Sequence, residues 1–345
     1  MGLNIDENKS KVNIDLQFIS NLIKDSYVHF NSYNYTFDVF CSKYHIFYII
    51  YTNEKKSLIS YNLNDNKKIN EIKQAHKDNI INIKHYSDKN HSRDLILSIS
   101  TDDNIKIWDI NNIECLVNIN NSNGENKGYL PYACLFYDND QYYILSCNYK
   151  FIYKSNESIS VLDFGGNIIK KINDSKDNSF FIDFYYNKNL SLKFILTGNK
   201  GFCKSYNYQK NTLYNKYNDY NIYGCYNNVM INTSKNSIKL IGTTLEGNIS
   251  IWDFCSGQLL NKIKINEEGA YGNYFWKNNY LFIGCTYGKI KIIDLKREKI
   301  IKEFFAHKTD TITIKVINHP KYGECLVSQG DGLTEIKLWK ININN

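Results

Sequence analysis

A short apolar motif that ends in Trp-Asp or a related pair recurs along the whole chain, and it constrains the fold more than any other feature. Two copies read Ile-x-Ile-Trp-Asp followed by an apolar residue, at residues 105–110 and 249–254. A third copy, Ile-Lys-Leu-Trp-Lys-Ile, lies at residues 336–341. Four weaker copies fill the intervals. The seven marked positions are Tyr61, Trp108, Leu162, Tyr206, Trp252, Ile293 and Trp339.

The spacing of these marks predicts one structural unit that is repeated. Neighbouring marks lie about 41 to 54 residues apart, a range that overlaps the period of about 40–45 residues of four-stranded repeats. Around each mark the sequence predicts strand, turn, strand, turn, marked strand, turn and strand. In the clearest copy the four strands are expected at 79–86, 94–100, 104–110 and 113–119. The inner strands are nearly continuous apolar runs, which are typical of a sheet that is covered on both faces.

These residues carry a resemblance to the WD-repeat family, whose repeats end their third strand in this way. The resemblance extends over nearly the whole chain. It implies an all-β, seven-bladed β-propeller of four-stranded antiparallel blades, in which each blade is sandwiched between two neighbours. We therefore expect a short tail at residues 1–12 and a single seven-bladed propeller at residues 13–345.

The two ends of the chain are expected to close the ring. The last marked strand reaches Ile341 and the sequence ends at Asn345, so the seventh blade has no outer strand of its own there. The alternating segment at residues 12–18 is then expected to supply that strand in the last blade, which would protect an open sheet edge. The same stretch also permits a helix, with apolar residues 16, 19 and 23 on one face.

Histidine, serine, aspartate and tryptophan recur in the same order in two of the repeats. In the WD-repeat family, residues at these places form a hydrogen-bonded network, and buried polar groups of these types need partners. Asp103 is an alternative to Asp102, because the spacing does not separate them. A His–Ser–Asp set also permits a hydrolase triad, but its recurrence in two repeats favours a structural role. The two sets are His76, Ser100, Asp102 and Trp108, and His307, Ser328, Asp331 and Trp339.

Motifs of enzymes and of ligand-binding propellers are missing from the sequence. There is no H-E-x-x-H, no G-x-S-x-G and no phosphate-binding glycine-rich loop. Sialidase-like propellers need clustered arginines to hold a carboxylate, whereas the only arginines here are Arg93 and Arg297. Lipid-binding propellers use an adjacent arginine pair, and ubiquitin-ligase receptors use W-D-x-R; neither occurs. We therefore expect a protein that is not an enzyme, with no cofactor and no metal site.

The long connections of the third repeat are the candidates for a partner-binding surface. In the resembled fold the connections at residues 148–157 and 120–128 open on the same face. Function concentrates in loops on a rigid scaffold, and exposed aromatic residues beside lysine are common binding anchors. An extra edge hairpin or a disordered insertion is the alternative interpretation. The candidate partner-binding residues are Tyr149, Lys150, Phe151, Tyr153 and Lys154.

Charge and cysteine usage bear on partners and compartment. The 345 residues carry a formal net charge of +7, almost all of it from lysine. Base reading favours bidentate arginine, so we expect a scaffold for one or more proteins of a multi-subunit assembly, monomeric outside it. Nucleic-acid or ribonucleoprotein binding through a Lys-rich face is the alternative. Nine cysteines without a C-x-x-C pair, and no signal peptide, predict a cytoplasmic or nuclear protein.

Overall fold

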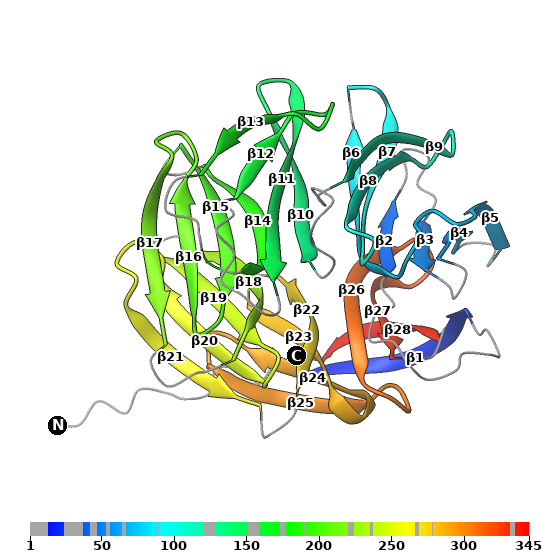
Figure 1. The fold of residues 1–345 in the computed structure, drawn as a ribbon. Helices are drawn as coiled ribbons and strands as arrows, with labels where there is room; N and C mark the ends of the chain where they lie inside the picture. Colours follow the sequence, from blue (N-terminus) through cyan, green and yellow to red (C-terminus); the bar gives the residue numbers. More distant parts are fainter. Residues whose placement is uncertain are drawn as a thin grey trace.

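A computed structural model describes the chain from residue 13 to residue 344, with gaps (Figure 1). The described residues form seven four-stranded antiparallel sheets. Their helical content is one short 3₁₀ turn, η1 (Thr286–Gly288), so they hold no helix long and apolar enough to cross a membrane. The described ranges are 13–23, 37–41, 47–52, 56–63, 67–88, 90–120, 129–150, 159–172, 177, 179–188, 191–219, 224–234, 237–265, 269–277, 279–331 and 335–344.

Six of the sheets are built from four strands that are consecutive in the chain. The first two consist of β2 (Phe37–Cys41), β3 (Phe47–Thr52), β4 (Leu58–Asn62) and β5 (Lys67–Ile72), then β6 (Ile80–Asp88), β7 (Arg93–Ser100), β8 (Asn104–Asp109) and β9 (Glu114–Asn120). The third and fourth consist of β10 (Tyr129–Asp138), β11 (Gln141–Lys150), β12 (Ser160–Leu162) and β13 (Ile168–Lys171), then β14 (Ser179–Asn187), β15 (Leu192–Asn199), β16 (Phe202–Asn207) and β17 (Thr212–Asn218).

The fifth and sixth sheets follow the same plan. They consist of β18 (Tyr226–Thr233), β19 (Ile238–Thr244), β20 (Asn248–Asp253) and β21 (Leu259–Lys264), then β22 (Ala270–Trp276), β23 (Tyr280–Cys285), β24 (Lys289–Asp294) and β25 (Lys299–Phe305). Each predicted strand of the clearest repeat, at residues 79–119, is present within two residues of its expected bounds.

The remaining sheet joins the two ends of the described chain. Strands β26 (Thr311–His319), β27 (Gly323–Gly330) and β28 (Ile336–Asn344) pair in order, and β1 (Asn13–Ile23) pairs antiparallel with β28. Leu16 lies opposite Ile341, and the side chain of Ile14 is buried. The prediction that the N-terminal segment supplies the outer strand of the last blade is confirmed. The helical alternative is wrong, because the backbone groups of this segment complete the edge of β28.

Each marked residue lies at the same irregularity in its sheet. Between Ile107 and Trp108 the pairing with β9 shifts by one residue, so the outer strand has one extra residue there. The same shift occurs between the marked residue and its predecessor in every sheet, including the pairing of β28 with β1. A β-bulge of this kind bends the strand and increases its twist. The periodicity of the sequence is therefore a periodicity of backbone geometry.

Neighbouring sheets pack face to face through apolar side chains. Leu97 and Ile107 of one sheet form a cluster with Leu135 and Ile144 of the next. Burial on both faces explains why the second strand of a repeat is an unbroken apolar run. Figure 1 shows the first strands of the sheets, such as β10, β14 and β26, towards the middle and fourth strands such as β17 and β21 at the periphery. The fold is a β-propeller of four-stranded antiparallel blades.

Candidate functional site

The first predicted network is assembled around His76, in the loop between β5 and β6. Its Nε2 lies 2.7 Å from the Ser98 hydroxyl, which also accepts a hydrogen bond of 2.8 Å from the Trp108 indole nitrogen. His76 Nδ1 lies 3.2 Å from both carboxylate oxygens of Asp102. A carboxylate only accepts, so Nδ1 carries a proton and donates it to Asp102. The network ties the loop and the β7–β8 turn to the marked strand.

The hydroxyl at the centre of this network belongs to Ser98 and not to Ser100, the residue that spacing favoured. Both lie on one face of β7, since side chains two residues apart in a strand share a face. Ser98 pairs with Lys106, two residues before Trp108, and so reaches the indole. Ser100 lies at the end of the strand, where its hydroxyl accepts a hydrogen bond of 3.1 Å from the Asp102 backbone.

Of the two candidate acids, the structure brings Asp102 to His76. The backbone N–H groups of Lys77 and Asn104 also donate to Asp102, at 2.7 Å and 3.0 Å. Burial raises the pKa of Asp102, but the hydrogen bond from His76 and these N–H groups outweigh it and hold the pKa well below its usual range. Asp103 occupies the left-handed position of the turn, with φ of 64°.

The second network repeats the centre of the first but not its acid. His307 Nε2 lies 2.8 Å from the Ser328 hydroxyl, and Trp339 donates to the same oxygen at 2.8 Å. The carboxylate beside His307 Nδ1 is that of Glu335, at 3.7 Å, rather than that of the predicted Asp331. Asp331 lies in the preceding turn, where its backbone carbonyl accepts a hydrogen bond from a threonine hydroxyl.

Both networks contain a lysine that sequence reasoning missed. Lys106 Nζ donates to the backbone carbonyl of Ala75 at 2.7 Å, and Lys337 Nζ donates to that of Ala306 at 2.7 Å. Each lysine therefore binds the residue directly before the network histidine. The signal was present, because Lys occurs two residues before Trp and Ala before His in both repeats.

These networks are suited to structure and not to nucleophilic catalysis. The side chains of Ser98 and Ser328 belong to residues with 0% exposure, so no substrate reaches either hydroxyl. Each oxygen already has a histidine and an indole as partners. A triad serine instead needs an exposed oxygen next to its base. The geometry therefore favours the structural interpretation of the His–Ser–Asp set.

In the blade that contains Trp252, a tyrosine takes the place of the network histidine and serine. Gly242 lies at the strand position that Ser98 occupies, and a Cβ there would meet the Tyr226 ring at 2.8 Å. The Tyr226 hydroxyl lies 3.0 Å from that of Ser250, which donates to Asp219 at 2.8 Å. Tyr226 thus fills the space of the histidine and serine, and this substitution explains why the blade lacks the predicted set.

The predicted partner-binding residues are only partly covered by the structure. Tyr149 and Lys150 end strand β11, where they pair with the backbone of Leu130 and Tyr129. Phe151, Tyr153 and Lys154 lie outside the described residues, as do the side chains of the first two. This surface stays a prediction.

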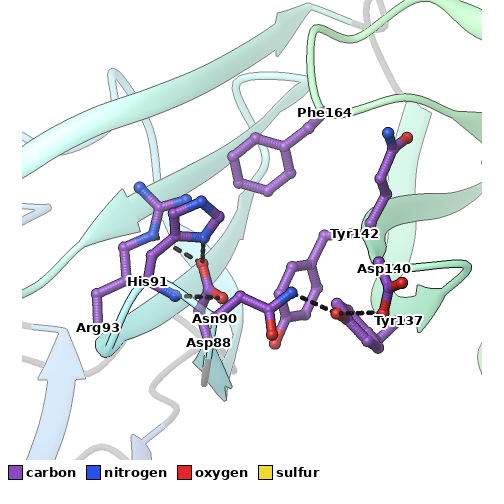
Figure 2. Close-up of a pocket in the computed structure, with 9 residues that line it drawn as sticks. Asp88, Asn90, His91, Arg93, Tyr137, Asp140, Tyr142 and Phe164 are labelled. Carbon is purple, nitrogen blue, oxygen red and sulfur yellow. Dashed lines mark hydrogen bonds and ion pairs between the residues drawn. The ribbon is translucent and has the colours of Figure 1, made fainter.

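A pocket that the sequence did not reveal lies between the β6–β9 sheet and the β10–β13 sheet (Figure 2). It has a volume of about 190 Å³. Residues from three parts of the chain supply its walls: Asp88 with 90–93, then 137–142, and Phe164 between β12 and β13. The lining residues are Asp88, Asn90, His91, Arg93, Tyr137, Asp140, Gln141, Tyr142 and Phe164.

Ion pairing orders the side of the pocket nearest β6. Arg93 Nε donates to the buried carboxylate of Asp88 at 2.8 Å, and His91 Nδ1 lies 2.9 Å from the same oxygen. Burial raises the pKa of Asp88, but the hydrogen bonds from Arg93 and His91 more than offset this and lower it. The charges of Asp88 and Arg93 therefore largely neutralise each other.

Aromatic residues form the rest of the wall. The rings of Tyr137 and Tyr142 meet edge to face with centroids 5.0 Å apart, and Phe164 lies 6.4 Å from Tyr142. The Tyr137 hydroxyl donates to Asp140 at 3.3 Å. Figure 2 shows Phe164 and Tyr142 on either side of the hollow, with Asp140 at one end and His91 at the other. Among the described residues no group of three His, Cys, Asp or Glu side chains is arranged to hold a metal ion.

The marked strands, their bulges and the two His–Ser–Trp networks define a β-propeller whose blades resemble those of the WD-repeat family. No protein-family model matches the chain. A segment of 68 residues, which is 20% of this chain, is 25% identical to the U3 small nucleolar RNA-associated protein 21 homolog of Schizosaccharomyces pombe. The match spans only 8% of that relative, so its activity and partners do not carry over as findings.

Proposed function

We propose that this protein is a non-catalytic WD-repeat scaffold that mediates protein–protein interactions within a larger intracellular complex. The observation that carries the proposal is the closure of the ring by β1 on β28, which makes one stiff body from the two ends of the described chain. The buried networks are engaged in holding loops to blades. A stiff body with loops on two faces is suited to hold several proteins at once.

We also infer that the ring has seven blades and forms a single domain over residues 13–345; residues 1–12 lie outside the described part. Seven four-stranded sheets support this count. The first and last sheets are neighbours, since Phe37 and Val39 share a core cluster with Ile317 and Val327. Lys315 of β26 also pairs with Asp38 of β2 at 3.2 Å. These contacts support a ring in which the first and last blades are neighbours.

The proposed partners are one or more proteins of a multi-subunit assembly in the cytoplasm or nucleus, with a monomeric propeller outside it. The test is affinity purification of the tagged protein from its own cells at low and high salt, followed by mass spectrometry. A discrete set of proteins that is retained at high salt supports the scaffold. Recovery of the propeller alone under both conditions contradicts it.

Nucleic-acid or ribonucleoprotein binding through a Lys-rich face is the second candidate. It is favoured by the net charge of +7 and by the name of the relative, which is associated with a small nucleolar RNA. Contacts with phosphates release counterions, so their affinity falls steeply with salt. In the same purification, RNA that is recovered at low salt and lost as the salt rises favours this candidate.

The face that binds partners is proposed to include the long connection of the third blade. Replacement of Tyr149, Phe151 and Tyr153 by Ser is expected to leave the melting temperature unchanged and to remove at least one co-purifying protein, because exposed aromatic residues act as anchors. The matched control is the replacement of Tyr287 and Phe305 by Ser, since these side chains are 73% and 75% exposed in another blade. Retention of every partner by the first variant contradicts the assignment.

A further inference from the structure

The pocket between the β6–β9 and β10–β13 sheets is a preorganised site. Asn139 and Asp140, with φ of 46° and 60°, form a two-residue turn that presents the Asp140 carboxylate. The turn that carries Phe164 is held by Asp163, which accepts hydrogen bonds of 2.9 Å and 2.8 Å from the Gly165 and Asn167 backbone. Little conformational entropy remains to be lost when a ligand enters such a site.

The charges of the lining favour a cation. Asp88 and Arg93 neutralise each other through their ion pair. Asp140 is the remaining carboxylate of the lining, and it accepts a hydrogen bond of 3.3 Å from the Tyr137 hydroxyl. Apart from His91, the ionisable acids and bases of the lining are thus two carboxylates and one guanidinium, a formal sum of −1. An anion would have to compete with Asp88 for Arg93 and would lie near a second carboxylate.

The aromatic walls favour the same ligand. Faces of tyrosine and phenylalanine rings attract cations within about 6 Å of their centroids. Phe164 already has the guanidinium of Arg93 at 6.0 Å, which shows that this ring can accept a cation. Tyr137 is 44% exposed and Tyr142 lines the hollow, so both rings are accessible to a side chain from outside.

We propose that this pocket binds the cationic end of a lysine or arginine side chain of a partner protein, against the exposed edges of the Tyr142 and Phe164 rings and next to Asp140. The proposal rests on the scaffold function above and names the chemistry of one of its contacts. The ammonium or guanidinium group pairs with the Asp140 carboxylate. The aliphatic stem lies against the Tyr142 and Phe164 rings, in the way that long basic side chains cover apolar surface.

The test uses small probes with the purified full-length protein, observed by saturation-transfer NMR. The cationic probes are n-butylammonium and n-butylguanidinium, and the matched neutral and anionic probes are butyramide and butyrate. The cationic probes are expected to bind with a dissociation constant on the order of 1 mM, and more strongly than the other two. The stronger of the two cations identifies lysine or arginine as the preferred side chain.

Two substitutions locate the binding in this pocket. Asp140→Asn removes the charge and Phe164→Leu removes a ring face, and each is expected to weaken cation binding by about threefold or more. The matched controls are Asp78→Asn and Phe305→Leu, which change exposed residues elsewhere and are expected to bind as the wild type does. Circular dichroism of each variant shows that it is folded.

The result that overturns the proposal is butyrate or butyramide binding as strongly as the cations, or cation binding that both pocket variants leave unchanged. Because the probes need no partner, this outcome is independent of the purification that tests the scaffold. If the probes behave as expected while no protein co-purifies, the pocket is a cation-binding site, but the scaffold function and the assignment to a partner side chain both fail. If proteins co-purify but the probes do not select cations, the scaffold function stands and the pocket assignment fails.

Discussion

Two sheets contain the same histidine–serine–tryptophan contacts, although their strands are connected differently along the chain. One is the sheet of β6 to β9, and the other joins β26, β27 and β28 to β1. In the first, four consecutive strands surround His76 and Trp108. In the second, the fourth strand comes from the opposite end of the described chain, yet His307, Ser328 and Trp339 have nearly the same distances. The centre of the network therefore depends on strand register and not on the continuity of the chain.

The two networks differ at their acidic end. Asp102 binds His76 directly, while Glu335 lies 3.7 Å from His307 and also pairs with Lys337 at 3.2 Å. Burial and the neighbouring Lys337 ammonium lower the pKa of His307 to about 3. The histidine, serine, tryptophan and lysine are thus common to both networks, whereas the acidic residue differs between them.

The largest expected effect comes from breaking the closure, which is present in only one of the two sheets. Ile14→Asp places a charge at a site that is 1% exposed, and burial of an unpaired charge is expected to cost more than about 3 kcal/mol of unfolding free energy. Deletion of residues 1–20 is expected to act in the same direction. Urea denaturation followed by circular dichroism measures both.

The control for this prediction is Gln17→Asp, which introduces the same charge at an exposed position of β1. It is expected to change the unfolding free energy by less than about 0.5 kcal/mol. If Ile14→Asp and Gln17→Asp unfold at the same urea concentration, β1 does not close the ring.

The second prediction concerns the constant centre of the two networks. Ser98→Ala and Ser328→Ala each leave a buried histidine and a buried indole without their shared partner, so each is expected to cost about 2–3 kcal/mol. Ser100→Ala is the matched control and is expected to cost about 1 kcal/mol, because it removes a single hydrogen bond to a backbone N–H. If Ser98→Ala and Ser100→Ala lose the same unfolding free energy in denaturant titrations, Ser98 is not the centre of the network.

A third prediction separates the two acids. Asp102→Asn removes charge from a carboxylate with several hydrogen bonds and is expected to cost about 1–2 kcal/mol. Glu335→Gln is expected to cost less than about 0.5 kcal/mol, since its distance of 3.7 Å from His307 is too long for a hydrogen bond and Gln can still accept one from Lys337. Thermal denaturation of both variants measures the difference, and a larger cost at Glu335 reverses the comparison.

The smallest effect is a pH dependence that comes from the histidine of the second network. The pKa of His307 is about 3 in the folded protein and 6.5 in the unfolded chain, so the unfolded chain takes up the proton first as the pH falls. Stability is therefore full above pH 6.5 and is lost progressively towards pH 3. We expect His307 to contribute a loss of about 1 kcal/mol between pH 7 and 5.5.

The measurement for this prediction is urea denaturation of the wild type and of His307→Gln at both pH values. The variant is expected to be less stable at pH 7 but to lose about 1 kcal/mol less on acidification. Identical losses in the two proteins show that His307 does not take part.

Much of the blade geometry was predictable because it depends on local pattern. The marked residues predicted the third strands, and the structure adds that each, as at Trp108, lies at a bulge. The alternation around Ile14 predicted the closing strand. The network acid was harder to predict, since Glu335 and Asp331 are both within reach of the turn. Ser98 and Ser100 share a strand face, so only the register with Lys106 separates them.

The pocket could not be predicted from sequence, because its walls come from turns that are far apart in the chain. Tyr142 and Phe164 belong to one sheet and Arg93 to its neighbour, and nothing in their local sequences indicates that they meet. Arg93 is one of only two arginines in the sequence, and this rarity was the one feature that could have drawn attention to the pocket.

The sequence by itself determined the all-β class, the length of the repeat and the strand order within each blade, because hydrophobic alternation and turn residues act over a few neighbouring positions. The tertiary structure alone decided which serine and which acid complete each network, and which turns form the pocket. These choices depend on strand register and on the contact between adjacent sheets, where residues that are tens of positions apart come within hydrogen-bond distance.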